Sequence, residues 1–200
     1  MELRYKSTRS NSEAVSASQA ILQGLAQDGG LYVPETLPRL DKSLEELSQM
    51  TYQETAYEVM KLFLTDFTES ELKDCIRKAY DSKFDTEVIA PIVEADGTYY
   101  LELFHGATIA FKDMALSILP HLLITSAKKN HVKNEIVILT ATSGDTGKAA
   151  LAGVADEGDE DYRLLSEKWR QPDSGKTDGH TERGEYVCRW HHREFRRCPD

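Results

Sequence analysis

The sequence predicts an α/β fold, in which a mainly helical N-terminal portion precedes the start of a parallel-sheet domain. Residues 10–80 contain several segments whose apolar side chains recur at helical spacing. EIVILTA, residues 135–141, is a continuous run rich in β-branched residues, which is typical of a strand buried on both faces. A glycine loop, SGDTG, and a helical pattern follow that strand, and this succession indicates a parallel sheet.

Residues 1–85 are expected to form the mainly helical domain. The segment SEAVSASQAILQGLAQD places alanine, isoleucine and leucine on one face of a helix that begins at Ser10 or Ser12 and stops at Gly29. GGLYVPE then reads as a short extended segment that ends at a proline-containing turn. Three further helices are expected over residues 43–50, 51–64 and 69–80.

Residues 86–158 are expected to form part of an α/β domain. Two β-rich runs flank Asp96 and Gly97, a pair typical of a hairpin turn. A helix is expected over residues 112–129, and Pro120 should kink or split it. After the strand at 135–141, the next helix should begin near Lys148.

The composition excludes several classes of function. A net charge of −10 over 200 residues argues against a nucleic-acid-binding protein and against a protein that binds an anionic membrane surface. No run of about 18 apolar residues predicts a membrane-spanning helix, and the first ten residues lack the apolar core of a signal peptide. The 3 widely spaced cysteines favour a reduced, cytoplasmic chain, and the histidines show no metal-ligand spacing.

Lys112 stands in an apolar segment, FHGATIAFKDMALS. Lysine is rarely buried without a partner, so its stem either lies along apolar surface with the ammonium in water or its amine is held in a pocket for chemistry. Asp113 could pair with it or cap the helix. A desolvated lysine amine has a lowered pKa and becomes nucleophilic.

The loop SGDTG lies between a predicted strand and a predicted helix. Backbone N–H groups of such a loop, with a helix N-terminus behind it, form an anion-binding cradle. The spacing of Gly144 and Gly147 is too short for a nucleotide-binding P-loop, and a plain strand-to-helix turn remains the alternative. A nucleophilic lysine together with an anion-binding loop is what a pyridoxal phosphate enzyme needs.

Three segments together resemble the N-terminal portion of threonine synthases. They are GGLYVPE at residues 29–35, YLELFHGATIAFKDMAL at 100–116 and ILTATSGDTGKAALAG at 138–153. Their order and spacing match the family, and the resemblance covers about residues 1–158. It implies the pyridoxal phosphate fold type II, of which this chain would hold an incomplete parallel sheet.

The resemblance also implies an activity and a set of site residues. The family converts O-phospho-L-homoserine and water to L-threonine and phosphate with pyridoxal 5′-phosphate. Lys112 falls on the family's cofactor lysine, which then moves protons as a free amine. The loop beside the cofactor ring falls on Ser143, Gly144, Asp145, Thr146 and Gly147. His105 and Thr108 are candidates for the substrate phosphate because they are close to Lys112 in the sequence.

Two departures from the family pattern affect these expectations. Ala107 stands where the family usually has proline, which would loosen the turn. The family's second glycine loop, which binds the cofactor phosphate, and the partner of the pyridine nitrogen would lie beyond this chain, so we expect little or no catalysis. Two alternatives are another pyridoxal phosphate-dependent lyase, such as a serine/threonine dehydratase, and a non-catalytic fragment. The sequence leaves the oligomeric state open.

Residues 159–200 show no helical or strand period and are expected to be a disordered, aberrant tail. One extra G in the codons around Gly158 would explain this change. Read one base later, the tail can encode TIVYY, a buried-strand pattern, and a further glycine loop. Trp169 and Trp190 each have a single codon, and both then become glycines where the family has glycine. The alternative is a genuinely divergent tail.

Overall fold

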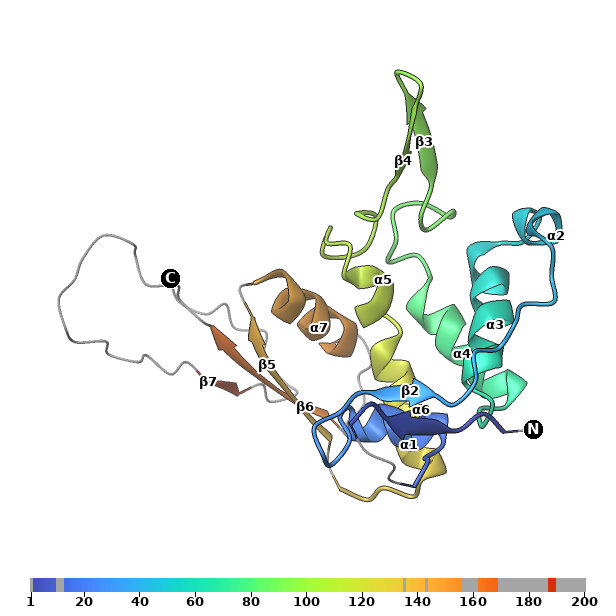
Figure 1. Cartoon of the computed structure of the whole chain (residues 1–200). Helices are drawn as coiled ribbons and strands as arrows, with labels where there is room; N and C mark the ends of the chain where they lie inside the picture. The colour runs from blue at the N-terminus through green and yellow to red at the C-terminus, as the bar shows by residue number, and fades with distance from the viewer. Residues whose placement is uncertain are drawn as a thin grey trace.

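The computed structural model describes residues 2–9, 13–134, 136–142, 144–155, 162–168 and 187–189 of the chain (Figure 1). The helices are α1 (Ala17–Gln23), α2 (Leu44–Ser48), α3 (Tyr52–Phe63), α4 (Glu69–Ala79), α5 (Asp113–Leu116), α6 (Leu119–Lys129) and α7 (Asp145–Ala155). The strands are β1 (Tyr5–Ser7), β2 (Tyr32–Pro34), β3 (Ile92–Ala95), β4 (Thr98–Leu101), β5 (Ile136–Thr142), β6 (Tyr162–Lys168) and β7 (Val187–Arg189).

Helices α2, α3 and α4 begin at capping boxes. Ser43, Thr51 and Thr68 each accept a hydrogen bond from the backbone N–H of a glutamate three residues later, whose side chain in turn accepts one from the N-cap N–H. This arrangement satisfies two of the backbone donors that a helix start leaves open. The predicted helices over residues 43–50, 51–64 and 69–80 are confirmed.

The first helix is shorter than the sequence pattern predicted. It begins after Ser16, which forms a capping box with Gln19, and ends at Gly24 rather than at Gly29. Val15 pairs with Tyr5 in an isolated β-bridge, and β1 pairs antiparallel with β2. The expected start at Ser10 or Ser12 was therefore wrong, because residues just before Ser16 satisfy their backbone groups by strand pairing.

The main apolar core joins α4 and α6 through the segment between α4 and β3. Its buried members are Phe67, Leu72, Cys75, Ile76, Ala79, Tyr80, Phe84, Ile89, Ile118 and Leu122. The core therefore draws on residues from both sides of position 85. The division into domains at 1–85, 86–158 and 159–200 stays a prediction.

The α/β prediction is confirmed by the later part of the chain. Pro120 lies in the first turn of α6, and the predicted helix over 112–129 is split into α5 and α6. Strand β5 leads into α7 and pairs in parallel with β6, with Ile136 opposite Tyr162. α7 packs on α5 so closely that a Cβ atom at Gly153 would lie 2.5 Å from the carbonyl oxygen of Leu116.

The range 159–200 contains two strands that the sequence did not predict. β6 pairs with β5, and β7 pairs antiparallel with β6. The expectation of no regular structure was wrong for these two segments, which extend the sheet in the order β5-β6-β7. The remaining predictions for this range, a disordered tail included, lie outside the described residues.

Candidate functional site

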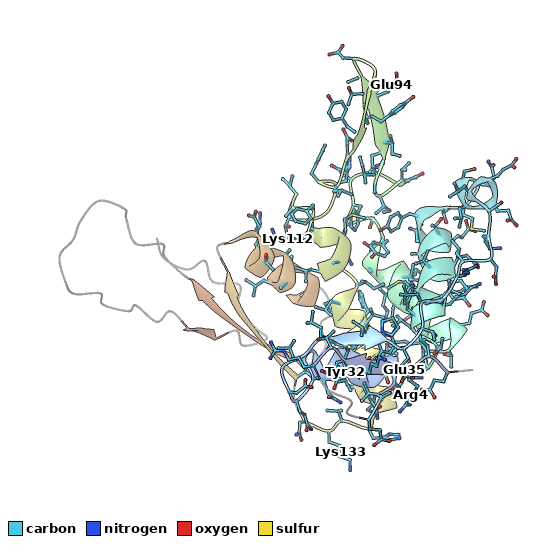
Figure 2. The ribbon with its side chains drawn as sticks, in the orientation of Figure 1. Arg4, Tyr32, Glu35, Glu94, Lys112 and Lys133 are labelled. Carbon is cyan, nitrogen blue, oxygen red and sulfur yellow. The ribbon has the colours of Figure 1, made fainter. Side chains whose placement is uncertain are left out.

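Lys112 lies immediately before α5, at the N-cap position, and its side chain is half-buried. Its Nζ atom is 4.6 Å from the centre of the Phe111 ring, within the range of a cation–π contact. The choice between the two sequence-based readings of this lysine stays a prediction. Figure 2 shows Lys112 near α5 and α7, below the β3–β4 hairpin.

Asp113 fixes the loop that leads into Lys112. The Asp113 side chain is 3 % exposed, and its Oδ2 accepts a hydrogen bond of 2.7 Å from the backbone N–H of Thr108. Its Oδ1 accepts a second bond, of 2.6 Å, from the Thr108 hydroxyl. The sequence suggested that Asp113 pairs with Lys112 or caps the helix; the structure instead uses both its oxygens to hold the preceding loop.

Gly106 and Ile109 show why this loop needs such an anchor. A Cβ atom at Gly106 would lie 2.5 Å from Asp113 Oδ2, so only glycine allows the loop to pass the carboxylate this closely. Ile109 has a φ of +66°, a conformation that β-branched residues rarely adopt. The two hydrogen bonds of Asp113 therefore hold a strained loop next to Lys112.

His105 is held between two carboxylates at the start of this loop. Its Nε2 is 2.8 Å from Glu102 Oε2, and its Nδ1 is 2.5 Å from Asp85 Oδ1. The hydrogen bond to Glu102, and to a smaller extent the one to Asp85, raises the pKa of His105 above its ordinary value. Sequence reasoning missed this cluster, although Glu102 three residues before His105 was a visible signal.

His105 and Thr108 were both candidates for the substrate phosphate. In the structure each already bonds a carboxylate: His105 bonds Glu102 and Asp85, and Thr108 bonds Asp113. Their polar groups are thus used inside the loop before Lys112. Ala107, where the family usually has proline, is exposed in the same loop.

The glycine loop lies at the start of α7. Gly144 has a φ of +145°, which favours glycine, and its carbonyl oxygen accepts a hydrogen bond from the backbone N–H of Lys148. Asp145 is the exposed first residue of α7, Thr146 is half-buried and Gly147 is buried. Ser143, the remaining predicted loop residue, lies outside the described residues. The helix begins at Asp145 rather than near Lys148, so the predicted loop includes its first turn.

The two predicted parts of the site lie at the starts of two helices, α5 and α7, that are in contact. Lys112 immediately precedes α5, and Gly144–Gly147 form the start of α7. The α5 backbone at Leu116 approaches Gly153 of α7. The amine of Lys112 therefore comes from the start of α5, and the backbone N–H groups come from the start of the adjacent helix α7.

A separate groove of about 940 Å³ lies between α3 and α4. Two ion pairs lie within it: Lys61 is 2.7 Å from Glu58, and Lys73 is 2.6 Å from Glu69. Both lysines also lie over the ring of Tyr57. The groove shares no lining residue with the segment around Lys112, and its paired charges do not point to an anion site.

Comparison with known proteins finds that most of this chain is similar to the N-terminal third of threonine synthases. A family model described as "Threonine synthase N terminus" matches residues 4–80. Threonine synthase of Saccharomyces cerevisiae is 36 % identical over 177 residues, covering 80 % of this chain and 34 % of the yeast protein. Threonine synthase of Pseudomonas aeruginosa is 42 % identical over 156 residues, covering 76 % of this chain and 32 % of that protein.

Solved structures give the same result. The crystal structure of yeast threonine synthase matches with a TM-score of 0.73 and 35 % identity, over 82 % of this chain and 35 % of the yeast chain. A structure of pyridoxal phosphate-bound threonine synthase from Brucella melitensis matches with a TM-score of 0.72 and 31 % identity, over 82 % of this chain and 35 % of that one. The chain thus spans about a third of the length of these relatives.

In the part of the chain that the structure describes, no helix is both long enough and apolar enough to cross a membrane.

Proposed function

Since about 80 % of this chain is similar to threonine synthases, we propose that it carries the part of a threonine synthase that supplies the cofactor lysine. The complete enzyme would use pyridoxal 5′-phosphate to convert O-phospho-L-homoserine and water to L-threonine and phosphate. The observation that supports this most directly is the anchored loop before Lys112, in which Asp113 binds Thr108 through both carboxylate oxygens.

The residues in this region fit such a cofactor. Lys112 offers a primary amine on a half-buried side chain, before a helix that packs on α7. The start of α7 offers backbone N–H donors and a glycine with positive φ, which suit an oxygen or a carboxylate. Pyridoxal phosphate, when bound, supplies an electron sink that stabilises negative charge on the substrate carbon.

Each residue then has a defined task. Lys112 holds the cofactor and, as a free amine, moves a proton at the substrate. Asp113 and Thr108 act as positioning residues, because they fix the loop and not the reacting atoms. The N–H groups of the SGDTG segment orient the cofactor ring oxygen and the substrate carboxylate; the residues of that segment are Ser143, Gly144, Asp145, Thr146 and Gly147.

The 200-residue chain by itself is expected to form little or no threonine. The cofactor-phosphate loop of the family would lie in the part of the relatives that this chain does not match, and these relatives are about three times as long as the matched region. We further propose that residues 159–200 result from one extra base near the codon for Gly158. The shifted reading restores a strand pattern and a glycine loop.

A chimera tests the proposed function. Residues 1–158 of this chain would be joined to the part of Pseudomonas aeruginosa threonine synthase that follows its matched region. We expect threonine and phosphate in equal amounts from O-phosphohomoserine, and loss of this activity in Lys112→Ala. Lys133→Ala, at an exposed lysine distant from Lys112 in Figure 2, is the control and should remain active.

Two results would reject the proposal. One is full activity of the chimera after Lys112→Ala. The other is a chimera that binds pyridoxal phosphate but deaminates serine or threonine in place of using O-phosphohomoserine, which would favour the dehydratase alternative. Borohydride reduction of the chimera with cofactor, followed by peptide mass spectrometry, identifies the modified lysine independently of activity.

A further inference from the structure

Helix α5, which follows Lys112 directly, is a short helix of 4 residues. A helix of this length gains little stability from its own backbone hydrogen bonds, so contacts with the rest of the protein must fix its position. At its start, Asp113 binds Thr108. At its end, the backbone of Leu116 lies against Gly153 of α7. A third contact reaches the middle of the helix from α4.

Tyr80 makes this third contact. It is the residue that ends α4, and its hydroxyl donates a 2.8 Å hydrogen bond to the backbone oxygen of Met114. The C=O groups in the last turn of a helix lack partners within the helix, and Met114 lies in the only turn of α5. The bond therefore supplies a donor to a backbone acceptor that lies two residues after Lys112.

The Tyr80 side chain is itself held on several sides. It is 5 % exposed, and its ring meets the ring of Tyr52 edge-on, with 4.8 Å between their centres. The ring of Phe84 lies 6.0 Å away on the same measure. Gln53 of α3 donates a 2.7 Å hydrogen bond from its side chain to the backbone oxygen of Tyr80. Tyr80 is therefore a donor whose ring and backbone are both fixed by the N-terminal helices.

The position of α5 is passed on to Lys112 through the backbone. The carbonyl oxygen of Lys112 accepts hydrogen bonds from the backbone N–H groups of Ala115 and Leu116. A movement of α5 would therefore carry the backbone of Lys112 with it. A displacement of about 1 Å in a reacting group can lower a rate about 100-fold, so a small movement of this helix has a large chemical effect.

We propose that Tyr80 is a positioning residue for Lys112, because its hydroxyl fixes the middle of the helix that follows the lysine. Asp113 and Thr108 hold the loop before Lys112, and Tyr80 holds the turn after it. The inference rests on the proposed function for the chemical role of Lys112. The fixing of α5 by Tyr80 can be measured in the 200-residue chain alone.

Tyr80→Phe tests this proposal, because it removes the hydroxyl and leaves the aromatic ring in the core. Tyr5→Phe is the matched control, since the Tyr5 hydroxyl also donates a 2.8 Å hydrogen bond to a backbone oxygen, that of Phe63. Tyr5 is in β1 beside Arg4, which lies well away from Lys112 in Figure 2. Both variants lose the same kind of bond, and only the bond of Tyr80 reaches α5.

Amide hydrogen exchange followed by mass spectrometry measures the position of α5 in the 200-residue chain. We expect the peptide over residues 113–117 to exchange at least ~3-fold faster in Tyr80→Phe, as the loss of one hydrogen bond allows. In Tyr5→Phe the same peptide should exchange as it does in the wild type. Urea denaturation of both variants separates this local change from a general loss of stability.

Kinetics of the chimera with Pseudomonas aeruginosa threonine synthase measures the effect on Lys112. With Tyr80→Phe, we expect kcat to fall at least ~10-fold while the KM for O-phosphohomoserine stays within about twofold of the wild-type value. The reason is that the amine is displaced while the groups that bind the substrate are unchanged. Tyr5→Phe should leave both constants unchanged.

Three results would overturn the proposal. They are equal exchange of α5 in Tyr80→Phe and the wild type, an unchanged kcat in the Tyr80→Phe chimera, and equal effects of Tyr80→Phe and Tyr5→Phe. The last would show only a general loss of stability. A wild-type chimera without activity would instead reject the proposed function, and hydrogen exchange would still decide whether Tyr80 fixes α5.

Discussion

At the residue scale, the position of Lys112 depends on side chains that precede and follow it. Asp113 is buried and hydrogen-bonds both the N–H and the hydroxyl of Thr108. These bonds span Ile109, whose positive φ costs about 1–3 kcal/mol for a residue of this type. A single carboxylate therefore maintains the strained loop from which the amine of Lys112 projects.

The sequence identified Lys112 but not the residues that position it. A lysine in an apolar segment is visible in the sequence, and the family resemblance assigned it a role. The bond between Asp113 and Thr108 depends on a turn at Ile109 that no local pattern indicates. Sequence reasoning therefore suggested the neighbouring Lys112 as the partner of Asp113.

His105 gives a pH-dependent prediction at the same scale. Its bonds to Glu102 and Asp85 raise its pKa in the folded state. A histidine with a raised folded pKa stabilises the protein fully below its unfolded pKa of about 6.5. This contribution is lost as the pH rises through the folded value. The stability of the loop should therefore decline across that pH window.

Glu102→Gln tests this prediction. The substitution removes the charge nearest Nε2, so the pKa of His105 should fall toward its ordinary value. NMR titration of the His105 ring protons measures it, and Glu94→Gln at the exposed hairpin tip is the control. An unchanged His105 titration in Glu102→Gln would contradict the assigned cause.

At the element scale, sequence reasoning succeeded where the signal was local. The pattern of serine or threonine followed by glutamate three residues later marks the starts of α2, α3 and α4. Pro120 correctly predicted the break between α5 and α6. The first helix was predicted too long because pairing between Tyr5 and Val15, ten residues apart in sequence, is not a local signal.

Packing of α7 on α5 gives a prediction at this scale. Gly153→Ala would improve the helix propensity of α7, yet its Cβ would lie 2.5 Å from the backbone oxygen of Leu116. Because a backbone oxygen cannot rotate away, we expect the two helices to separate and the protein to lose about 1–3 kcal/mol of stability. Urea denaturation measures this loss.

Lys148→Ala is the control for this experiment, because it introduces alanine at an exposed position of the same helix. Its stability should change by less than about 0.5 kcal/mol. A Gly153→Ala protein that is as stable as the wild type would show that the helices yield at little cost.

At the scale of the whole molecule, one core supports both the N-terminal helices and the Lys112 segment. The Tyr80 hydroxyl donates a 2.8 Å hydrogen bond to the backbone oxygen of Met114 in α5, and Ile118 and Leu122 pack against α4. Burial raises the pKa of Tyr80 well above its usual range, so this donor keeps its proton. The two portions that the sequence separated near residue 85 therefore share their packing.

The position of β6 bears on the proposed extra base. In parallel sheets, strands next to a buried strand are usually near-continuous apolar runs. β6 occupies this place beside β5, yet its sequence, YRLLSEK, contains three charged residues. In the shifted reading, the positions from Tyr162 to Leu165 encode IVYY, which fits a strand inside a parallel sheet far better.

Resequencing the coding DNA from codon 150 to codon 200, and several hundred bases beyond, decides between the two readings. We expect one extra G near codon 158, followed after its removal by a long open frame that encodes the rest of a threonine synthase. Removing that base should then yield a full-length protein that forms threonine without any chimera. An intact frame through Asp200, with no family sequence in the shifted frame, would refute the extra base. β6 would then be a natural charged strand.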